Sequence, residues 1–373
     1  MVVESFLGVS QSMNQPKPEQ RNSDTLELAE ERIVNSVVER TPQEQKIGDV
    51  ERYVGLGAGA FCLVTWRLLS RPFVIFQRQC QVNRDASTSF SVFSPFSTLG
   101  VMANIASHQG SPSQWGGLGG ELVVIGIQGV SENLLNESRY LPKSLSDVNG
   151  SVMLTGHLMN RCVSFLLSSP FYASSVVQSV QSHLDGGTPA VFDCIKSGVA
   201  QIFGYKICSR YFLSLYITAP VFVGYNLLQY CTEAIVTSCI NRFTAWTHPE
   251  DSNGSESSIL SVFYPQLLCG TISTAVSSVL LYPVQTVLHR LVVQGTQTVI
   301  DNTDTGIGCV PVHTMYSGFV DCWMTTIQEE GWNGLYKGFS SLLLQLVLGI
   351  AIVHAAKVVF IHFAEDSQTG RQQ

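Results

Sequence analysis

Long apolar stretches separated by polar ones are the main pattern of this chain. Six of the apolar stretches are long enough to cross most of a bilayer as a helix, which takes about 20 residues. They cover residues 53–76, 118–135, 152–180, 211–235, 260–293 and 339–363. Polar linkers, at residues 139–150 and 241–258, separate them into pairs. The pattern therefore predicts an all-α membrane protein with six transmembrane helices in three pairs.

A proline ends the first stretch of each pair, at Pro72, Pro170 and Pro283. A repeat that contains two long helices indicates three pseudo-symmetric units rather than a soluble solenoid. We expect repeat 1, a degenerate repeat 2, repeat 3 and a C-terminal tail at residues 51–138, 152–240, 259–364 and 365–373.

Glycine pairs with GxxxG spacing occur in the first two stretches, at Gly55 with Gly59 and at Gly116 with Gly120. In a bilayer, such pairs let helix backbones approach closely where lipid provides no hydrophobic driving force. We therefore expect both pairs to mark helix packing rather than a nucleotide loop, since no βαβ pattern surrounds them.

Residues 1–50 are polar and carry too little apolar surface to offset the entropy cost of ordering. We expect a disordered, solvent-facing tail. Residues 24–40 are an exception, because Asp24 can cap a helix whose apolar residues share one face. This segment is either a helix that docks a partner or a transient or packed local helix.

Composition agrees with a place in a membrane, since 45% of the residues are hydrophobic and only 13% are charged. A net charge of −7 without a basic cluster argues against nucleic-acid binding. The ten cysteines form no CxxC pair, which favours free thiols over a zinc site or disulfide framework. No HExxH, GxSxG or Walker motif is present, so we predict no enzyme, no cofactor and no metal site.

The most complete local motif precedes the last apolar stretch. It has an acid and a glycine, four spacers, then an aromatic residue, a base and a glycine, at Glu330, Gly331, Tyr336, Lys337 and Gly338. A worn copy precedes the second stretch, with Gln109, Gly110, Trp115, Gly116 and Gly117. We interpret the motif as structural, with a glycine for a tight bend, a tyrosine at the membrane interface and a lysine at a polar surface.

Together, the proline-containing helix pairs and this motif resemble the mitochondrial carrier family, solute carrier family 25. In transporting members, the resemblance implies that an acid and a base after each proline pair between repeats and close one end of a central cavity. Here the acidic positions hold Val74, Tyr172 and Gln285, and the basic positions hold Gln77, Ser175 and Leu288. A buried ion pair can stabilise a closed state by a few kcal/mol, whereas a glutamine contact contributes about 1 kcal/mol at best. None of these six gate positions is charged, so we expect that the protein has lost ordinary solute exchange.

Longer strings narrow the resemblance to the outer-membrane branch of that family that includes member 46. They fall within residues 78–83, 282–291, 294–304 and 316–331. This branch implies an adaptor in the mitochondrial outer membrane that influences fission, fusion, cristae organisation and lipid homeostasis. The implied partners are outer-membrane lipids, mitofusins, the inner-membrane fusion dynamin, the cristae-organising complex and an endoplasmic reticulum membrane complex.

Charges inside the apolar stretches are candidates for function, because a charge near the bilayer centre costs at least roughly 2.5 kcal/mol. Lys357, well inside the last stretch, is the candidate that faces a cavity. We expect Arg67, Arg71 and Glu121, near segment ends, to snorkel towards the interface. Two further candidates are Arg161 and Glu233.

The polar connection after the third proline is a candidate for protein docking, through His289, Arg290, Asp301, Asn302 and Asp304. The alternative is a connector that satisfies its own backbone through Asx turns.

Two functions remain open. The uncharged gate positions favour a non-enzymatic adaptor, whereas the six-helix frame and Lys357 favour a solute or lipid transporter with a remodelled cavity.

Overall fold

The structure is a computed structural model that describes residues 42–84, 94–137, 151–182, 191–203, 215–247 and 259–369. The helix expected at residues 24–40 and the whole linker at 139–150 lie outside these ranges. The surroundings of Gly55 and Gly59 also lie outside what is described.

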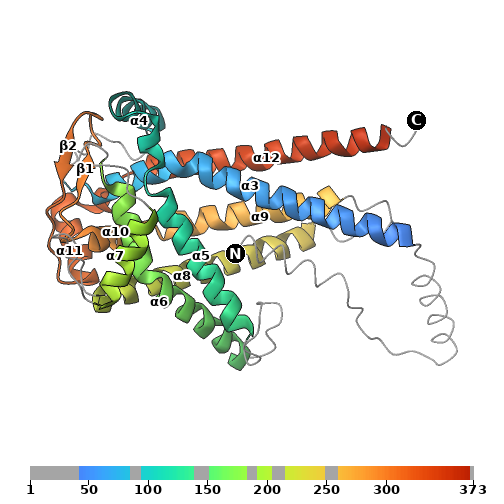
Figure 1. The fold of residues 1–373 in the computed structure, drawn as a ribbon, viewed down its shortest axis with the longest axis horizontal. Helices are drawn as coiled ribbons and strands as arrows, with labels where there is room; N and C mark the ends of the chain where they lie inside the picture. The colour runs from blue at the N-terminus through green and yellow to red at the C-terminus, as the bar shows by residue number, and fades with distance from the viewer. Residues whose placement is uncertain are drawn as a thin grey trace. The chain divides into compact units, whose positions relative to one another are not determined.

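Helices make up most of the described chain (Figure 1). Their order runs long, short, long in the first two groups and long, short, short, long in the third. The first group is α3 (Pro42–Val82), α4 (Pro95–Gln109), the 3₁₀ helix η1 (Ser111–Trp115) and α5 (Leu118–Glu137). The second is α6 (Ser151–Val180), α7 (Val191–Phe203) and α8 (Leu215–Thr247). The third is α9 (Ile259–Leu280), α10 (Tyr282–Val293), α11 (Phe319–Glu330), the 3₁₀ helix η4 (Trp332–Tyr336) and α12 (Phe339–Thr369).

The chain divides into two compact units. The larger unit consists of Trp66–Thr247 and Thr271–Ile350. The smaller unit consists of Met1–Thr65, His248–Gly270 and Ala351–Gln373. All gate positions and the motif at residues 330–338 belong to the larger unit, whereas Lys357 belongs to the smaller one.

The helices follow the apolar stretches with two differences. α8 continues to Thr247, so the start of the predicted linker at 241–258 is helical. The stretch at 260–293 is not one straight helix, because Leu267–Leu280 and Tyr282–Val293 are bent by 66° relative to each other. Hydropathy gives the extent of an apolar stretch, but it does not report a bend inside it.

The predicted helix ends at the prolines are wrong for repeats 1 and 2. α3 and α6 continue past Pro72 and Pro170, to Val82 and Val180. Proline removes one helical hydrogen bond, and neighbouring helices can compensate for that loss without ending the helix. Pro283 instead lies in the first turn of α10, where the missing N–H would have had no helical partner.

One described helical segment, Trp332–Val359, is long and apolar enough to cross a membrane. The bent pair Leu267–Leu280 and Tyr282–Val293 meets the same condition only when its two parts are taken together. Six separate spans therefore remain a prediction.

A small β-hairpin between α10 and α11 departs from the all-α expectation. Strands β1 (Val299–Asp301) and β2 (Cys309–Pro311) pair antiparallel, with Ile300 opposite Val310. Ile300 is fully buried and belongs to the main apolar core. This core joins α6, α8 and α10 through Val176, Phe222 and Leu288, among others.

Gly120 on α5, one member of the predicted pair Gly116 and Gly120, packs closely against two other helices. A Cβ at this position would lie 2.8 Å from Gln178 Oε1 on α6 and 3.3 Å from Cys194 Sγ on α7. The three helices therefore pass close to one another at this glycine, and a larger residue would require Gln178 to move.

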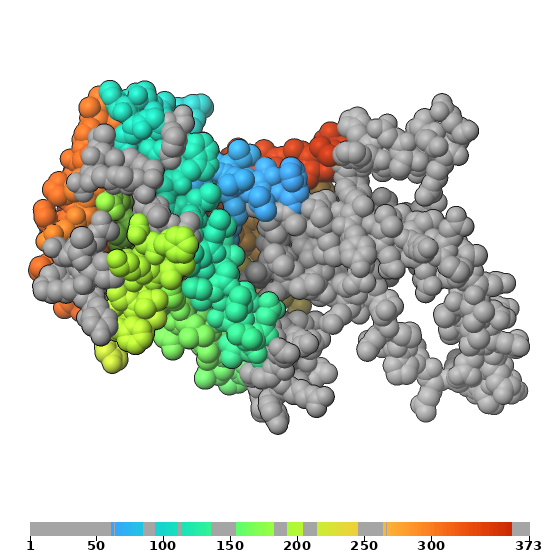
Figure 2. All heavy atoms as spheres, in the orientation of Figure 1, coloured from blue at the N-terminus to red at the C-terminus, as the bar shows by residue number. Residues whose placement is uncertain are grey.

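Large apolar side chains remain exposed on α5 and α7, which share one face of the larger unit in Figure 2. On α5 they are Leu122, Ile125, Val130 and Leu134. On α7 they are Phe192, Ile195, Val199, Ile202 and Phe203. Exposed apolar patches of this kind mark surfaces that contact a membrane or another protein.

Candidate functional site

The gate positions of repeats 1 and 3 meet through uncharged amides. Gln77 Nε2 on α3 donates to Gln285 Oε1 on α10 at 3.3 Å. Gln345 Nε2 on α12 donates to Gln77 Oε1 at 2.6 Å. A basic and an acidic position of the carrier pattern are thus paired by hydrogen bonds between neutral groups.

A second uncharged link lies one helical turn further along α3 and α10. His289 Nδ1 donates to Gln81 Oε1 at 2.6 Å, and the Tyr172 hydroxyl donates to His289 Nε2 at 2.9 Å. Tyr172 occupies the acidic gate position of α6, and its ring packs on Phe222 with centroids 4.4 Å apart. Three helices from three predicted repeats are therefore joined here without an ion pair.

The other three gate positions contribute packing. Leu288 is fully buried in the main core, and Ser175 is buried where α6 passes Gly120. Val74 is half-buried on α3. At these positions, van der Waals contact replaces the electrostatic attraction of the carrier pattern.

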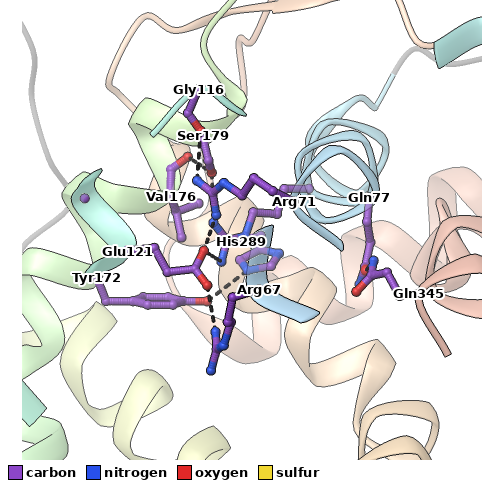
Figure 3. A network of polar contacts seen from close by, with 12 residues as sticks. Arg67, Arg71, Gln77, Gly116, Glu121, Tyr172, Val176, Ser179, His289 and Gln345 are labelled. Atoms are coloured by element: carbon purple, nitrogen blue, oxygen red, sulfur yellow. Dashed lines mark hydrogen bonds and ion pairs between the residues drawn. The ribbon is translucent and has the colours of Figure 1, made fainter. Parts of the chain in front are cut away.

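Close to the uncharged links, three arginines of α3 converge on one carboxylate of α5, as Figure 3 shows in part. Arg67 Nη1 lies 2.7 Å from Glu121 Oε1, and Arg71 Nη1 contacts Oε2. Arg78 Nη2 lies 3.9 Å from the same Oε2. Three positive charges thus share one negative charge, and we call these four residues the arginine cluster.

Within the arginine cluster, burial of Arg71 corrects the prediction that this residue snorkels. Only 1% of the Arg71 side chain is exposed, and its Nη2 donates to Gly116 O at 2.8 Å. Its Nε has no hydrogen-bond partner among the described residues. Glu121 is 18% exposed, whereas Arg67 is 56% exposed. Pairing with Glu121 offsets part of the cost of burying Arg71, so the side chain does not need to reach water.

The sequence does contain a signal for this cluster. Arg67, Arg71 and Arg78 fall on one face of a helix, because they are separated by four and seven residues. Their common partner lies on another helix, and a single helix pattern does not identify it.

The remaining charged candidates each have partners. Arg161 on α6 forms an ion pair with Glu132 on α5 and lies 5.0 Å from the centroid of the Tyr230 ring. Buried Glu233 accepts from Gln229 at 3.1 Å and from Ser277 at 3.2 Å. In the smaller unit, Lys357 Nζ lies 4.6 Å from the centroid of the Tyr264 ring.

The motif at residues 330–338 forms a charged corner. Glu330 receives two hydrogen bonds from Arg290, at 2.5 and 2.9 Å, and its Oε2 lies 2.7 Å from Lys337 Nζ. Burial raises the pKa of Glu330, but the bonds and charges of Arg290 and Lys337 outweigh burial and lower the pKa below its ordinary value. Lys337 also donates to Asn83 O and Arg84 O at the end of α3. The lysine therefore joins two repeats and does not extend to a polar surface as predicted.

The docking candidates differ in accessibility. His289 and Arg290 are completely buried, so these two side chains do not form a docking surface in this conformation. Asp301 is also buried, whereas Asn302 and Asp304 are partly exposed. Asn302 Oδ1 accepts from the backbone N–H of Asp304 at 2.9 Å, which is the Asx turn of the alternative interpretation.

Among the described residues, no group of three or more His, Cys, Asp or Glu side chains could hold a metal ion. Nine described cysteines are free thiols, and four of them are buried.

Comparisons with known proteins agree with the earlier resemblance. Residues 261–366 match the family model for mitochondrial carrier protein. Solute carrier family 25 member 46-B of Xenopus laevis is 35% identical over 318 residues, which cover 83% of this chain and 76% of that protein. Mitochondrial outer membrane protein SLC25A46 of Gallus gallus is 33% identical over 83% of this chain and 77% of its own length. The protein of that name from Homo sapiens is 31% identical over 85% of this chain and 77% of its own length.

Proposed function

Because this chain belongs to the mitochondrial carrier family, we propose that it is a multi-pass outer-membrane protein that acts as a non-enzymatic adaptor. The names of its relatives support the outer membrane as the location. The exposed apolar faces of α5 and α7 support contact with lipid. Six membrane crossings in three repeats are part of this proposal.

The uncharged gate is the observation that carries the proposal. The family resemblance implies that a transporting carrier closes one end of its central cavity with ion pairs between repeats and releases them when that end opens. In this chain Gln77, Gln285, Tyr172 and His289 form neutral hydrogen bonds at the equivalent place. Each such bond contributes about 1 kcal/mol, so charge pairing no longer drives closure. The carrier scaffold then serves as a membrane-embedded platform for other proteins.

By resemblance, we propose that this platform influences mitochondrial fission and fusion, cristae organisation and lipid homeostasis. The proposed partners are mitofusins, the inner-membrane fusion dynamin, the cristae-organising complex and an endoplasmic reticulum membrane complex. Crosslinking in intact mitochondria followed by mass spectrometry tests these contacts. Crosslinks to members of these groups are expected, and their absence alongside crosslinks to unrelated membrane proteins would contradict the proposal.

Reconstitution tests the loss of transport. The purified protein in liposomes should exchange a panel of labelled metabolites no faster than protein-free liposomes do. A transporting carrier prepared in the same way is the positive control. Saturable exchange by this protein that Lys357→Ala abolishes would overturn the adaptor proposal.

The arginine cluster favours a second function, transport of an anionic solute or lipid through a remodelled cavity. Three guanidinium groups meet one carboxylate, and Arg67 is half-exposed beside the buried Arg71. Uptake of an anionic solute that Arg67→Gln removes, with neutral solutes excluded, would favour this function. Lys196→Gln is the control, because it also removes one positive charge but lies on the exposed face of α7, and it should leave uptake unchanged.

A further inference from the structure

The hairpin of β1 and β2 is too small to be stable by itself. Each strand has only three residues, and an isolated two-stranded hairpin is at best marginally stable in water. Its place in the larger unit therefore depends on contacts with other elements. Figure 1 shows it beside α4 and α10.

The hairpin is bonded to the end of α3. Gln79 Nε2 donates to Asp301 Oδ2 at 2.9 Å, and Asn83 Nδ2 donates to Thr303 Oγ1 at 2.9 Å. All four of these side chains are buried. Cys80, between the two donors, is also buried.

The same hairpin is bonded to α4. Gln109 Nε2 donates to Asp301 Oδ1 at 2.6 Å, so both oxygens of this carboxylate have amide donors from different helices. Asn104 Nδ2 donates to Thr305 O at 3.2 Å. Gly306 touches α4 so closely that a Cβ would lie 2.8 Å from Val101 O.

A third set of contacts reaches the end of α6. The backbone N–H of Ser182 donates to Val299 O at 2.8 Å, and Ser182 Oγ lies 3.2 Å from Cys309 Sγ. Ile300 enters the core that contains Val176 and Val180 of α6. One short hairpin thus connects α3, α4 and α6, which belong to two other predicted repeats.

We propose that residues 299–311 form a clasp that holds these three helices together, and that this end of the larger unit opens only when the clasp detaches. The gate positions form no ion pair, so the clasp supplements the neutral hydrogen bonds that join α3, α6 and α10. Asp301 is the central residue, since it accepts hydrogen bonds from two helices and is nearly inaccessible to water. The clasp does not depend on whether the protein is an adaptor or a transporter.

Two glycines of the clasp provide a matched pair for a test. Gly306 and Gly308 both have left-handed φ values, 74° and 82°. A Cβ at Gly306 collides with α4, whereas a Cβ at Gly308 meets no atom within 4 Å. Asparagine tolerates this backbone region better than most residues. Gly306→Asn should therefore detach the clasp, and Gly308→Asn should leave it in place.

The thiol of Cys80 reports detachment, because access to a buried group depends on local opening. Alkylation of the full-length protein by N-ethylmaleimide is followed by peptide mass spectrometry, with exposed Cys239 as the internal reference. Gly306→Asn should raise the relative rate at Cys80 on the order of tenfold, and Gly308→Asn should leave it unchanged. Equal rates at Cys80 in the two variants, with both folded, would overturn the clasp.

A second variant decides the question if Gly306→Asn does not fold. Ser182→Cys places a second sulfur beside Cys309, and copper phenanthroline should oxidise the two thiols to a disulfide with loss of two electrons and two protons. The bond fixes the hairpin to the end of α6. Alkylation of Cys80 should then become slower than in the wild type, and reduction should restore its rate. An unchanged rate in the disulfide-linked protein would contradict the proposal.

Discussion

Two corners of the larger unit have the same backbone and different side-chain chemistry. In each, a 3₁₀ helix, η1 or η4, connects a short helix to a long one. The preceding glycines, Gly110 and Gly331, have φ values of 85° and 71°. The following glycines, Gly117 and Gly338, have φ values of 65° and 80°. Left-handed φ is accessible to glycine at little cost, so the glycines preserve the shape of both corners.

The contacts of the two corners are different. In the corner of repeat 3, Glu330 is paired with Arg290 and Lys337 within its own repeat. In the corner of repeat 1, Gln109 takes the place of the acid and bonds to Asp301 of the clasp. Gly116 occupies the position that Lys337 has in repeat 3. Its carbonyl accepts a hydrogen bond from Arg71, whereas Lys337 donates to Asn83 O, just after α3. The comparison teaches that backbone geometry requires these glycines, whereas the charges can be replaced by other contacts.

Removal of the acid in repeat 3 should have the largest effect. Glu330→Gln leaves Arg290 buried without its carboxylate and should lower the free energy of unfolding by about 3 kcal/mol. Chemical unfolding of the detergent-solubilised protein measures this. Glu329→Gln is the control, because the neighbouring Glu329 is 40% exposed in its pair with Arg84, and such pairs contribute less than about 1 kcal/mol. Equal losses in the two variants would contradict the role of the corner.

Acid should remove the contribution of Glu330. Its pKa in the folded state lies below the ordinary value of 4.5, so its stabilising effect is present above that pH and is lost as pH falls through the folded pKa. The difference in unfolding free energy between the wild type and Glu330→Gln should stay constant from pH 7 to about pH 5 and shrink below about pH 4.5. A difference that is undiminished at about pH 3 would show that charge is not its cause.

The glycines before the two corners should have similar effects on stability. Gly110 and Gly331 combine positive φ with ψ values of 156° and −173°, a region that is almost restricted to glycine. Gly110→Ala and Gly331→Ala should each lower the free energy of unfolding by about 1–3 kcal/mol. Gly126→Ala in α5 is the control, since a Cβ there meets no atom within 4 Å. A much smaller loss at Gly110 than at Gly331 would show that the two corners are not equivalent.

The smallest effect is expected for the aromatic residue of the worn corner. Trp115 Nε1 donates to Leu68 O at 3.1 Å from an exposed position. Trp115→Phe keeps an aromatic ring and should cost about 0.5–1 kcal/mol in unfolding free energy. Thermal unfolding in detergent checks this, and a loss as large as that of Glu330→Gln would contradict the order of effects.

Much of the fold follows from local pattern. The apolar stretches at 118–135 and 152–180 correspond to α5 and α6 because helix length and apolar length coincide there. The glycines of both corners could also be predicted from the sequence, because the bend that each one permits depends on the local motif around it. The effect of each proline was not visible, because neighbouring helices decide whether a proline bends or ends a helix.

The sequence by itself determined the helical frame, the loss of all six gate charges and the two glycine corners. Only the tertiary structure decided that Arg71 is buried against Glu121, that Gln77 reaches Gln285, and that Asp301 joins two helices. The partners in these contacts are 50 to 222 residues apart in the chain. Periodicity reports which face of one element is apolar, whereas the partner of a polar side chain depends on which elements pack together.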